Sequence, residues 1–373
     1  MSLSRQFPMF AALTLLVCVA CAAGAPAAPG DAVTQAVASD SAFVTALRAQ
    51  LTAATAADEF SGAVLVARDG RTVFEGAYGL ADREKGVANT PATQFRVGSM
   101  NKMITAVAAL QLVQAGTLRL DVPLGNYLPD YPNSDVASKV TLHHLLTHTG
   151  GTGDIFGSAF NANRLELRNI SDYVRLYGSR GVQFTPGAQH VYSNYGFMLL
   201  GAVIERVSGK SYDEHVAARV LAPAGMTATG SLPEDVQVPG RAMGYMKQGS
   251  GGFVSNAPTL PYRGTPAGGG YSTVGDWARF AAALRDDRLL DAKHTALLVT
   301  GKVDVAPGYQ YAYGFIDRQT GGRRWVGHSG GAQGMNGDLA FEPNGGYTVV
   351  VLSNLDPPAA GRVSSFILSR LPK

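Results

Sequence analysis

Residues 95–102 read FRVGSMNK and place Ser99 three positions before Lys102. A helix is predicted from Met100 to Ala115, and residues three apart share one helical face, so the Lys102 amine should lie beside the Ser99 hydroxyl. A serine hydroxyl is a weak nucleophile, and a lysine can activate it when burial lowers the pKa of the amine. The helix N-terminus would add positive potential where an oxyanion forms. Taken alone, this motif is more typical of a serine that caps a helix.

A second segment carries groups that the same chemistry needs. Tyr192 and Asn194 directly precede a predicted helix over Tyr195–Ser208. A polarised tyrosine can act as a base for a serine nucleophile, and an asparagine amide can hold both the substrate and a lysine. A residue in this place also commonly serves only as a helix cap.

A third segment, residues 327–331, reads GHSGG at the end of a predicted strand. Glycines in a strand allow a substrate to lie close to its backbone. The backbone N–H groups of Ser99 and Gly331 would then form an oxyanion hole, and His328 would hydrogen-bond the reacting group. The alternative is a glycine-rich turn with an incidental histidine.

In this order, the three segments resemble the serine hydrolases of the class C β-lactamase family, which also contains penicillin-binding DD-peptidases and family VIII carboxylesterases. The resemblance covers the chain from about Phe60 to Asn354, and residues 145–150 (LLTHTG) and 267–272 (AGGGYS) add framework motifs of that family. It implies a β-lactamase/transpeptidase-like α+β fold and an acyl-enzyme mechanism that needs neither a metal nor an organic cofactor.

The resemblance also implies a role for each motif residue. These are Ser99 as the acylated nucleophile, Lys102 as its activating partner, Tyr192 as the general base, Asn194 as a substrate-positioning amide, and Gly330 and Gly331 as substrate and oxyanion contacts.

His328 departs from the family pattern, because many members carry the lysine of a Lys-Thr-Gly motif at this place. A lysine is a fixed cation that suits a substrate carboxylate, whereas a histidine is mostly neutral at pH 7. We therefore expect a small-molecule ester, peptide or peptidoglycan-like substrate, ordered as carboxylester, then D-amino-acid peptide or amide, then β-lactam. The alternatives are a D-alanyl-D-alanine carboxypeptidase-like or β-lactamase activity, or a catalytically weak envelope binding protein.

Hydrophobic patterning predicts an antiparallel sheet that is built from both ends of the chain and flanked by helices. A hairpin is predicted over Phe60–Gly79, since Asp69-Gly70 suits a tight turn between two β-rich runs. Two more hairpins are predicted near the C-terminus, with Tyr309–Asp317 and Arg323–Gly327 in one and Asp338–Glu342 and Tyr347–Ser353 in the other. The hydrolase domain would span residues 31–373, with a helical insertion over about 105–270.

The first 22 residues are predicted to be a signal peptide, because an apolar run over Met9–Ala20 follows Arg5 and is too short to span a bilayer. Residues 23–30 would form a flexible linker. Both cysteines, Cys18 and Cys21, lie in this leader, so the mature chain would hold no disulfide. We expect a periplasmic or secreted protein, with membrane attachment only if the leader is retained or Cys21 is lipidated; Cys18 makes the lipoprotein signal a poor match.

Composition and spacing exclude three other classes. With 31 Lys+Arg, 28 Asp+Glu and no basic run, the chain lacks the footprint of a nucleic-acid-binding protein. The GHSGG segment also fits the α/β-hydrolase elbow, but that fold needs a histidine after its serine, and His328 is the last one in the chain. His144 and His148 are four apart, yet Leu145 stands where a zinc protease helix has glutamate, so both are predicted to be structural residues of a partly buried helix and no metal site is expected.

Overall fold

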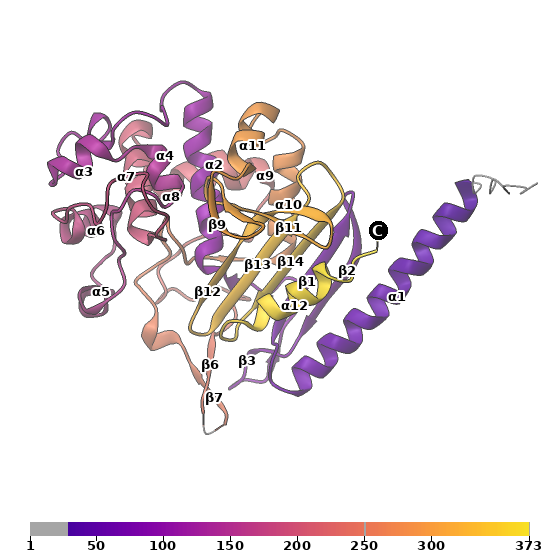
Figure 1. Cartoon of the computed structure of the whole chain (residues 1–373). Coiled ribbons are helices and arrows are strands. Elements are labelled where there is room, and N and C mark those ends of the chain that lie inside the picture. The colour runs from indigo at the N-terminus through magenta and orange to yellow at the C-terminus, as the bar shows by residue number, and fades with distance from the viewer. Residues whose placement is uncertain (1–28, 250, 373) are drawn as a thin grey trace, which may run out of the picture.

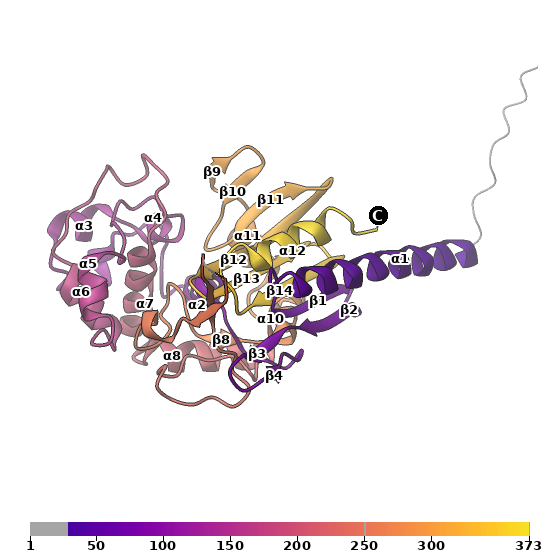
Figure 2. The same cartoon turned by 90° about the horizontal axis from the view of Figure 1, so that it is seen from below.

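The computed structural model describes residues 29–249 and 251–372. The predicted signal peptide lies outside the described residues, as does the predicted linker up to Ala28. Pro29 and Gly30, assigned to that linker from the sequence, instead open helix α1 (Pro29–Ala56), which projects from the body of the molecule (Figure 2). None of the helices in the two described ranges has the length and hydropathy of a membrane-spanning segment.

A large antiparallel sheet forms the centre of the molecule (Figure 1). The chain's two ends meet in it, because β1 pairs with β14 and places Gly62 opposite Ser353. In spatial order its strands are β2 (Arg71–Tyr78), β1 (Gly62–Arg68), β14 (Tyr347–Ser353), β13 (Met335–Phe341), β12 (Arg323–Ala332), β11 (Ile316–Thr320), β10 (Tyr309–Tyr311) and β9 (Val303–Ala306). Three short pairs lie outside it: β3 (Leu80–Asp82) with β4 (Val87–Ala88), β5 (Phe95–Arg96) with β8 (Tyr271–Ser272), and β6 (Tyr245–Lys247) with β7 (Phe253–Ser255).

Both faces of the sheet are buried, which explains why its central strands are apolar at consecutive positions. In β1, Leu65 faces a core shared with the helical part of the chain, while Val64 and Val66 face a second core. The second core lies under α1 and α12 (Ala359–Leu368), where fully buried Leu47 and Ile367 approach the sheet. Burying each of these side chains stabilises the fold by roughly 1.5–3 kcal/mol.

The helices gather mainly beyond the opposite face of the sheet, with α2 standing between the sheet and the helical insertion (Figures 1 and 2). They are α2 (Asn101–Gln114), α3 (Ser134–Lys139), α4 (Leu142–Leu146), α5 (Ser158–Asn163), α6 (Ile170–Tyr177), α7 (Asn194–Ser208), α8 (Tyr212–Val216), α9 (Ala222–Ala224), α10 (Val274–Arg285) and α11 (Ala292–Val299). Short turns of other helical types are η1 (Gly98–Met100), η2 (Leu124–Asn126), η3 (Ala217–Leu221) and η4 (Ala257–Thr259).

The predicted hairpins are present, with some changes at their ends. Asp69 and Gly70 take φ values of 48° and 77° in the first turn, as a tight hairpin turn requires. The predicted strand over Tyr309–Asp317 is wrong as a single strand, because Gly314, with φ 69°, lies in a break between β10 and β11. Strand β12 continues to Ala332, beyond the predicted end at Gly327, so the GHSGG segment lies within the sheet.

The prediction of one helix carrying His144 and His148 is also wrong. Helix α4 ends at Leu146, and His148 lies beyond it with a left-handed backbone, φ 57°. This turn takes the His148 ring away from the helix axis and brings it to within 4.2 Å of the Tyr192 ring, measured between centroids.

Candidate active site

Ser99 lies in the η1 turn, which joins β5 to α2. Phe95, which precedes the turn, and Met100, its last residue, are fully buried and fix its two ends in the core. Gly98 has a φ of 53°, which an L side chain rarely adopts, and its carbonyl accepts a hydrogen bond from the N–H of Gly269 at 3.1 Å. The turn therefore presents the Ser99 hydroxyl next to the first turn of α2.

Lys102 is completely buried beneath Ser99 on the first turn of α2. Its Nζ donates to Ser99 Oγ at 3.2 Å and to Asn194 Oδ1 at 2.7 Å, and it also donates to the Ala267 carbonyl. Burial lowers the pKa of Lys102 to about 7, although the Asp154 carboxylate opposes this shift. A substantial fraction of the amine is therefore unprotonated at neutral pH and can accept a proton from Ser99.

Asp154 fixes the orientation of the Asn194 amide. Its carboxylate accepts from the backbone N–H of Asn194 at 3.0 Å and from Asn194 Nδ2 at 3.2 Å. Because the amide nitrogen points to Asp154, the amide oxygen must point to Lys102. Asp154 thus acts on the lysine twice, through its charge and through the orientation of Asn194.

Tyr192 lies on the other side of Ser99. Its hydroxyl lies near Ser99, and Lys102 Nζ lies 4.7 Å from the centre of its ring. The residue is 37% exposed along the cleft, yet burial of the hydroxyl raises the pKa of Tyr192 well above its usual value. At neutral pH this group is therefore a neutral phenol in contact with the nucleophile.

Strand β12 closes the site from the side of the sheet. Its backbone at Gly330 approaches the Ser99 turn so closely that a β-carbon there would lie 1.9 Å from the Val97 carbonyl oxygen and 3.0 Å from the Ser99 nitrogen. The nitrogen of Gly331 lies beside Gly98 in the same contact. Glycine at position 330 is thus a steric requirement, and the backbones that carry the two predicted oxyanion donors, Ser99 and Gly331, lie side by side.

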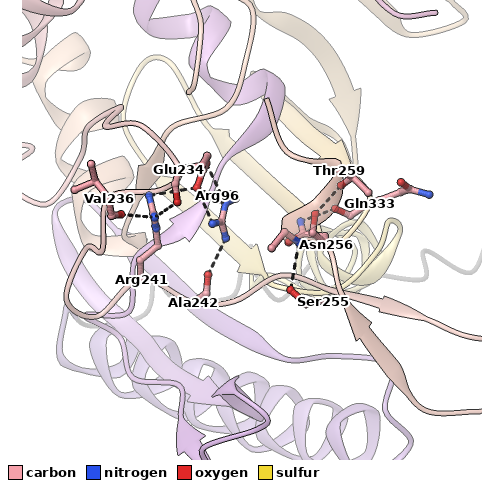
Figure 3. A network of polar contacts seen from close by, with 10 residues as sticks. Arg96, Glu234, Val236, Arg241, Ala242, Ser255, Asn256, Thr259 and Gln333 are labelled. Atoms are coloured by element: carbon pink, nitrogen blue, oxygen red, sulfur yellow. Dashed lines mark hydrogen bonds and ion pairs between the residues drawn. The ribbon is translucent and has the colours of Figure 1, made fainter. Parts of the chain in front are cut away.

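A cavity of about 780 Å³ opens on the Asn194 side of Ser99. Its walls are mainly apolar, with Ile155, Phe156, Phe160, Tyr173, Leu260 and Met335 among them. Asn256 connects two parts of this wall, because its Nδ2 donates to the Gln333 carbonyl at 2.8 Å while its own carbonyl accepts from Thr259 Oγ1 at 2.8 Å (Figure 3). A substrate group of substantial size could lie there.

A buried ion-pair network holds the strand that precedes Ser99 (Figure 3). Arg96, at the end of β5, donates to Glu234 at 2.7 Å and to the Ala242 carbonyl at 3.0 Å. Arg241 lies 3.4 Å from the same carboxylate and donates to the Val236 carbonyl at 2.8 Å. One carboxylate therefore balances two largely buried guanidinium groups.

Glu234→Ala is expected to lower the free energy of unfolding by about 3 kcal/mol, because it leaves both arginines buried without their carboxylate. The matched control is Glu166→Ala, whose exposed pair with Arg168 spans 3.9 Å and should contribute less than about 1 kcal/mol. Urea unfolding of the two variants measures the difference. Similar losses in both would show that the network does not hold this strand.

The sequence model of the Beta-lactamase family matches residues 47–371. The chain belongs to this family. Esterase EstB of Burkholderia gladioli is 32% identical to it over 291 residues, which cover 68% of this chain and 74% of that protein. Among solved structures, a penicillin binding protein from Bacillus halodurans has a TM-score of 0.78 and 33% identity, covering 85% of this chain and 98% of its own. A D-stereospecific amidohydrolase from Streptomyces sp. has a TM-score of 0.74 and 28% identity, covering 87% and 98%.

Membership of the Beta-lactamase family makes the chain a serine hydrolase, as the sequence predicted. The α+β fold with a large antiparallel sheet is confirmed as well. Ser329, the serine of the rival elbow motif, lies inside β12 and is followed by strand β13 rather than by a helix. Within residues 29–249 and 251–372, no cluster of three or more His, Cys, Asp or Glu side chains is arranged to hold a metal ion.

The structure brings the residues singled out from the sequence together around one cleft of this Beta-lactamase-family fold. Ser99, Lys102 and Asn194 share direct hydrogen bonds, and Tyr192 contacts Ser99 from the other side. The expectation that His328 hydrogen-bonds the reacting group stays a prediction. Its Nε2 forms a hydrogen bond with Tyr311 Oη at 3.0 Å, and its Nδ1 faces the Ser329 carbonyl.

Sequence reasoning missed three residues of the site, namely Asp154, His148 and Tyr311. None of the three belongs to a recognised catalytic motif. Each lies in the site because the fold brings its segment there. A weak signal existed for His148, which lies in the LLTHTG framework segment, but it was taken as structural.

Proposed function

We propose that the chain is an exported hydrolase that forms an acyl-enzyme on Ser99 and then releases a carboxylic acid. The observation that carries this proposal is the buried Lys102 amine, whose pKa is lowered to about 7 and whose Nζ lies 3.2 Å from Ser99 Oγ. An unprotonated amine in this position is a base suited to activating a serine hydroxyl.

In the first half-reaction, Ser99 Oγ attacks the substrate carbonyl carbon while its proton passes to Lys102. The N–H groups of Ser99 and Gly331 would stabilise the negative charge on the carbonyl oxygen. As the bond to the leaving group breaks, the leaving atom takes a proton from the Tyr192 hydroxyl, which is replenished from Lys102. Water then attacks the acyl carbon, and the same groups return the proton to Ser99 as the acid leaves.

This assignment divides the proton transfers differently from the role that the family resemblance implies for Tyr192. Because burial raises the pKa of the Tyr192 phenol, tyrosinate is scarce at neutral pH. Lys102 is therefore the proposed base, and Tyr192 relays the proton between Ser99 and the leaving group.

For the substrate, we propose a carboxylester first and a D-amino-acid peptide or amide second. Relatives named as an esterase and as a D-stereospecific amidohydrolase support both classes. D-alanyl-D-alanine carboxypeptidase-like or β-lactamase activity is a second candidate, because a penicillin binding protein shares the fold at 33% identity. A catalytically weak binding protein of the envelope is the remaining alternative.

A burst experiment with intact-mass readout tests the proposal. One sample receives p-nitrophenyl butyrate, another a penicillin, and the Ser99→Ala variant is the control. Rapid ester turnover with little penicillin adduct supports the esterase, whereas a long-lived penicillin adduct on Ser99 supports a DD-peptidase-like enzyme. Absence of both turnover and adduct would contradict acyl-enzyme chemistry with these substrates and favour the binding protein.

Export is proposed from the leader over residues 1–22. Expression of the full chain in a bacterial host should yield a periplasmic or secreted protein that lacks this leader by N-terminal mass analysis. A cytoplasmic protein that retains residues 1–22 would contradict the proposal.

Tyr192→Phe is expected to lower kcat/KM for an ester by about 10²–10³, because it removes the proton relay but leaves the Lys102–Ser99 pair. The loss should be larger for an amide than for an activated ester, since an amine leaving group depends more on protonation. Steady-state kinetics with the two substrate types measures it. Equal losses would argue against the role of Tyr192 in protonating the leaving group.

A further inference from the structure

A second cavity, of about 310 Å³, lies on the Tyr192 side of Ser99. It shares Ser99 and Gly331 with the larger cavity, so the two open from the nucleophile in different directions. Val305 and Tyr309 are half-exposed at its rim, at 50% and 38%. Tyr192, Tyr311 and Ile316 also line it, so its walls are largely apolar and aromatic.

Tyr311 and His328, in one wall of this cavity, belong to a chain of hydrogen bonds in which each group donates to the next. Ser193 N–H donates to His148 Nδ1 at 3.2 Å, so His148 carries its proton on Nε2 and donates to Tyr311 Oη at 2.9 Å. Tyr311 Oη in turn lies 3.0 Å from His328 Nε2 and donates to it. The remaining ring nitrogen of His328, Nδ1, donates to the Ser329 carbonyl.

This arrangement leaves His328 without a free polar atom for a substrate. A further proton on its Nε2 would place two donors against the Tyr311 oxygen and leave the Tyr311 proton without an acceptor. Burial and the nearby Lys102 act in the same direction and lower the pKa of His328 to about 4. At neutral pH the wall is uncharged.

Lys102 is committed to Ser99, Asn194 and the Ala267 carbonyl, and the other charged and titratable groups around this wall do not supply a cation to the cavity. Burial lowers the pKa values of His148 and His190, so both rings are neutral at pH 7. Arg318 is committed to Asp338 at 3.3 Å. Among the described residues that line the cavity there is no Lys or Arg side chain.

We propose that this cavity receives the leaving group and selects uncharged ones, with Tyr311 as the positioning residue that keeps His328 turned away from the substrate. The inference rests on the proposed function, in which Tyr192 protonates the leaving atom. Because the Tyr192 hydroxyl contacts Ser99 and Tyr192 lines this cavity, the departing group should lie here and the acyl group in the larger cavity. A leaving group with a free carboxylate would lose its hydration without gaining a cation.

The test compares phenyl butyrate with 3-carboxyphenyl butyrate on the full-length protein, after correcting for their hydroxide-catalysed rates. The two esters share an acyl group, so the ratio of their kcat/KM values reports the leaving-group cavity during acylation. We expect the uncharged ester to be favoured by at least about tenfold. A ratio near one, or a preference for the carboxylate, would overturn the proposal.

Two variants test which residues cause the preference for the uncharged leaving group. His328→Lys introduces a cation and should reduce the ratio by about tenfold. Tyr311→Phe releases His328 Nε2 toward the cavity and should also reduce the ratio, which a purely structural loss of active protein would not change. The matched control is Tyr313→Phe, which removes the hydroxyl of another buried tyrosine, bonded to His143 at 2.8 Å outside the cavity, and should leave the ratio unchanged.

The outcomes separate this inference from the proposed function. Turnover of both esters with no preference contradicts only the inference, whereas absence of turnover and of any mass adduct on Ser99 contradicts the proposed function on which it rests. If Tyr311→Phe and Tyr313→Phe give the same ratio as the unmodified protein, Tyr311 does not position His328.

Discussion

Ser99→Ala is expected to lower kcat/KM by about 10⁴ or more, because it removes the only atom that could carry the acyl group in the proposed mechanism. The fold should be unaffected, since the hydroxyl is an acceptor from Lys102 and an alanine fits the same turn. Ester turnover and intact mass after mixing with substrate measure the two parts of the prediction. The variant should show neither turnover above background nor an adduct.

A matched serine serves as the control. Ser329 is an exposed residue of β12 that lines the same cleft, and it belongs to the rival elbow motif. Ser329→Ala should still form the adduct on Ser99. Loss of the adduct in this variant but not in Ser99→Ala would show that the nucleophile has been assigned wrongly.

Lys102→Met should reduce activity by about 10³ while raising stability at neutral pH, so its two effects have opposite signs. Activity falls because the base is lost. Stability rises because methionine removes the cost of burying the Lys102 amine, which is protonated in the unfolded chain. This cost is on the order of a few kcal/mol, and the hydrogen bonds of Nζ only partly offset it. A variant that loses both activity and stability would contradict this account of the lysine.

The pH dependence follows from the same shift. The pKa of Lys102 is about 7 in the folded chain and roughly 10.4 in an unfolded one. Activity should therefore fall below a midpoint near pH 7, as the amine becomes protonated. Between the two pKa values the unfolded state binds more protons, so stability rises with pH and the gap between Lys102→Met and the unmodified protein should narrow from pH 7 to 9. A constant gap would place the Lys102 pKa outside this window.

Much of the sheet could be predicted because its signals are local. The turn at Asp69-Gly70 and the apolar run that precedes it depend on neighbouring residues alone, and the structure confirms this hairpin. The break inside the predicted strand over 309–317 could not be seen in the same way. Gly314 takes a φ of 69° there, and a β-carbon would lie 2.9 Å from the Lys102 carbonyl oxygen, so this position requires glycine through a contact between segments far apart in the chain.

The candidate site shows the same division. Ser99 and Lys102 are three residues apart, so helix geometry alone predicted that they would meet. Tyr311 and His148 could not be found by spacing, because a strand at the far end of the sheet and a loop after α4 bring them together. The role expected for His328 stays a prediction, and the hydrogen bond of its Nε2 to Tyr311 could not be foreseen for the same reason, since the fold brings that tyrosine to it.

The pairing of β1 with β14 also governs the order in which the chain can be assembled. In the described sheet, the hairpin of β1 and β2 is joined to the other strands through β14. Strand β1 therefore lacks its second partner strand until the residues up to Ser353, which lies opposite Gly62, have been synthesised. A nascent chain on the ribosome cannot complete the sheet until synthesis is nearly finished, and contacts so distant in sequence form slowly. Loss of β14 and α12 would therefore leave the amino-terminal hairpin without its partner strand in the sheet.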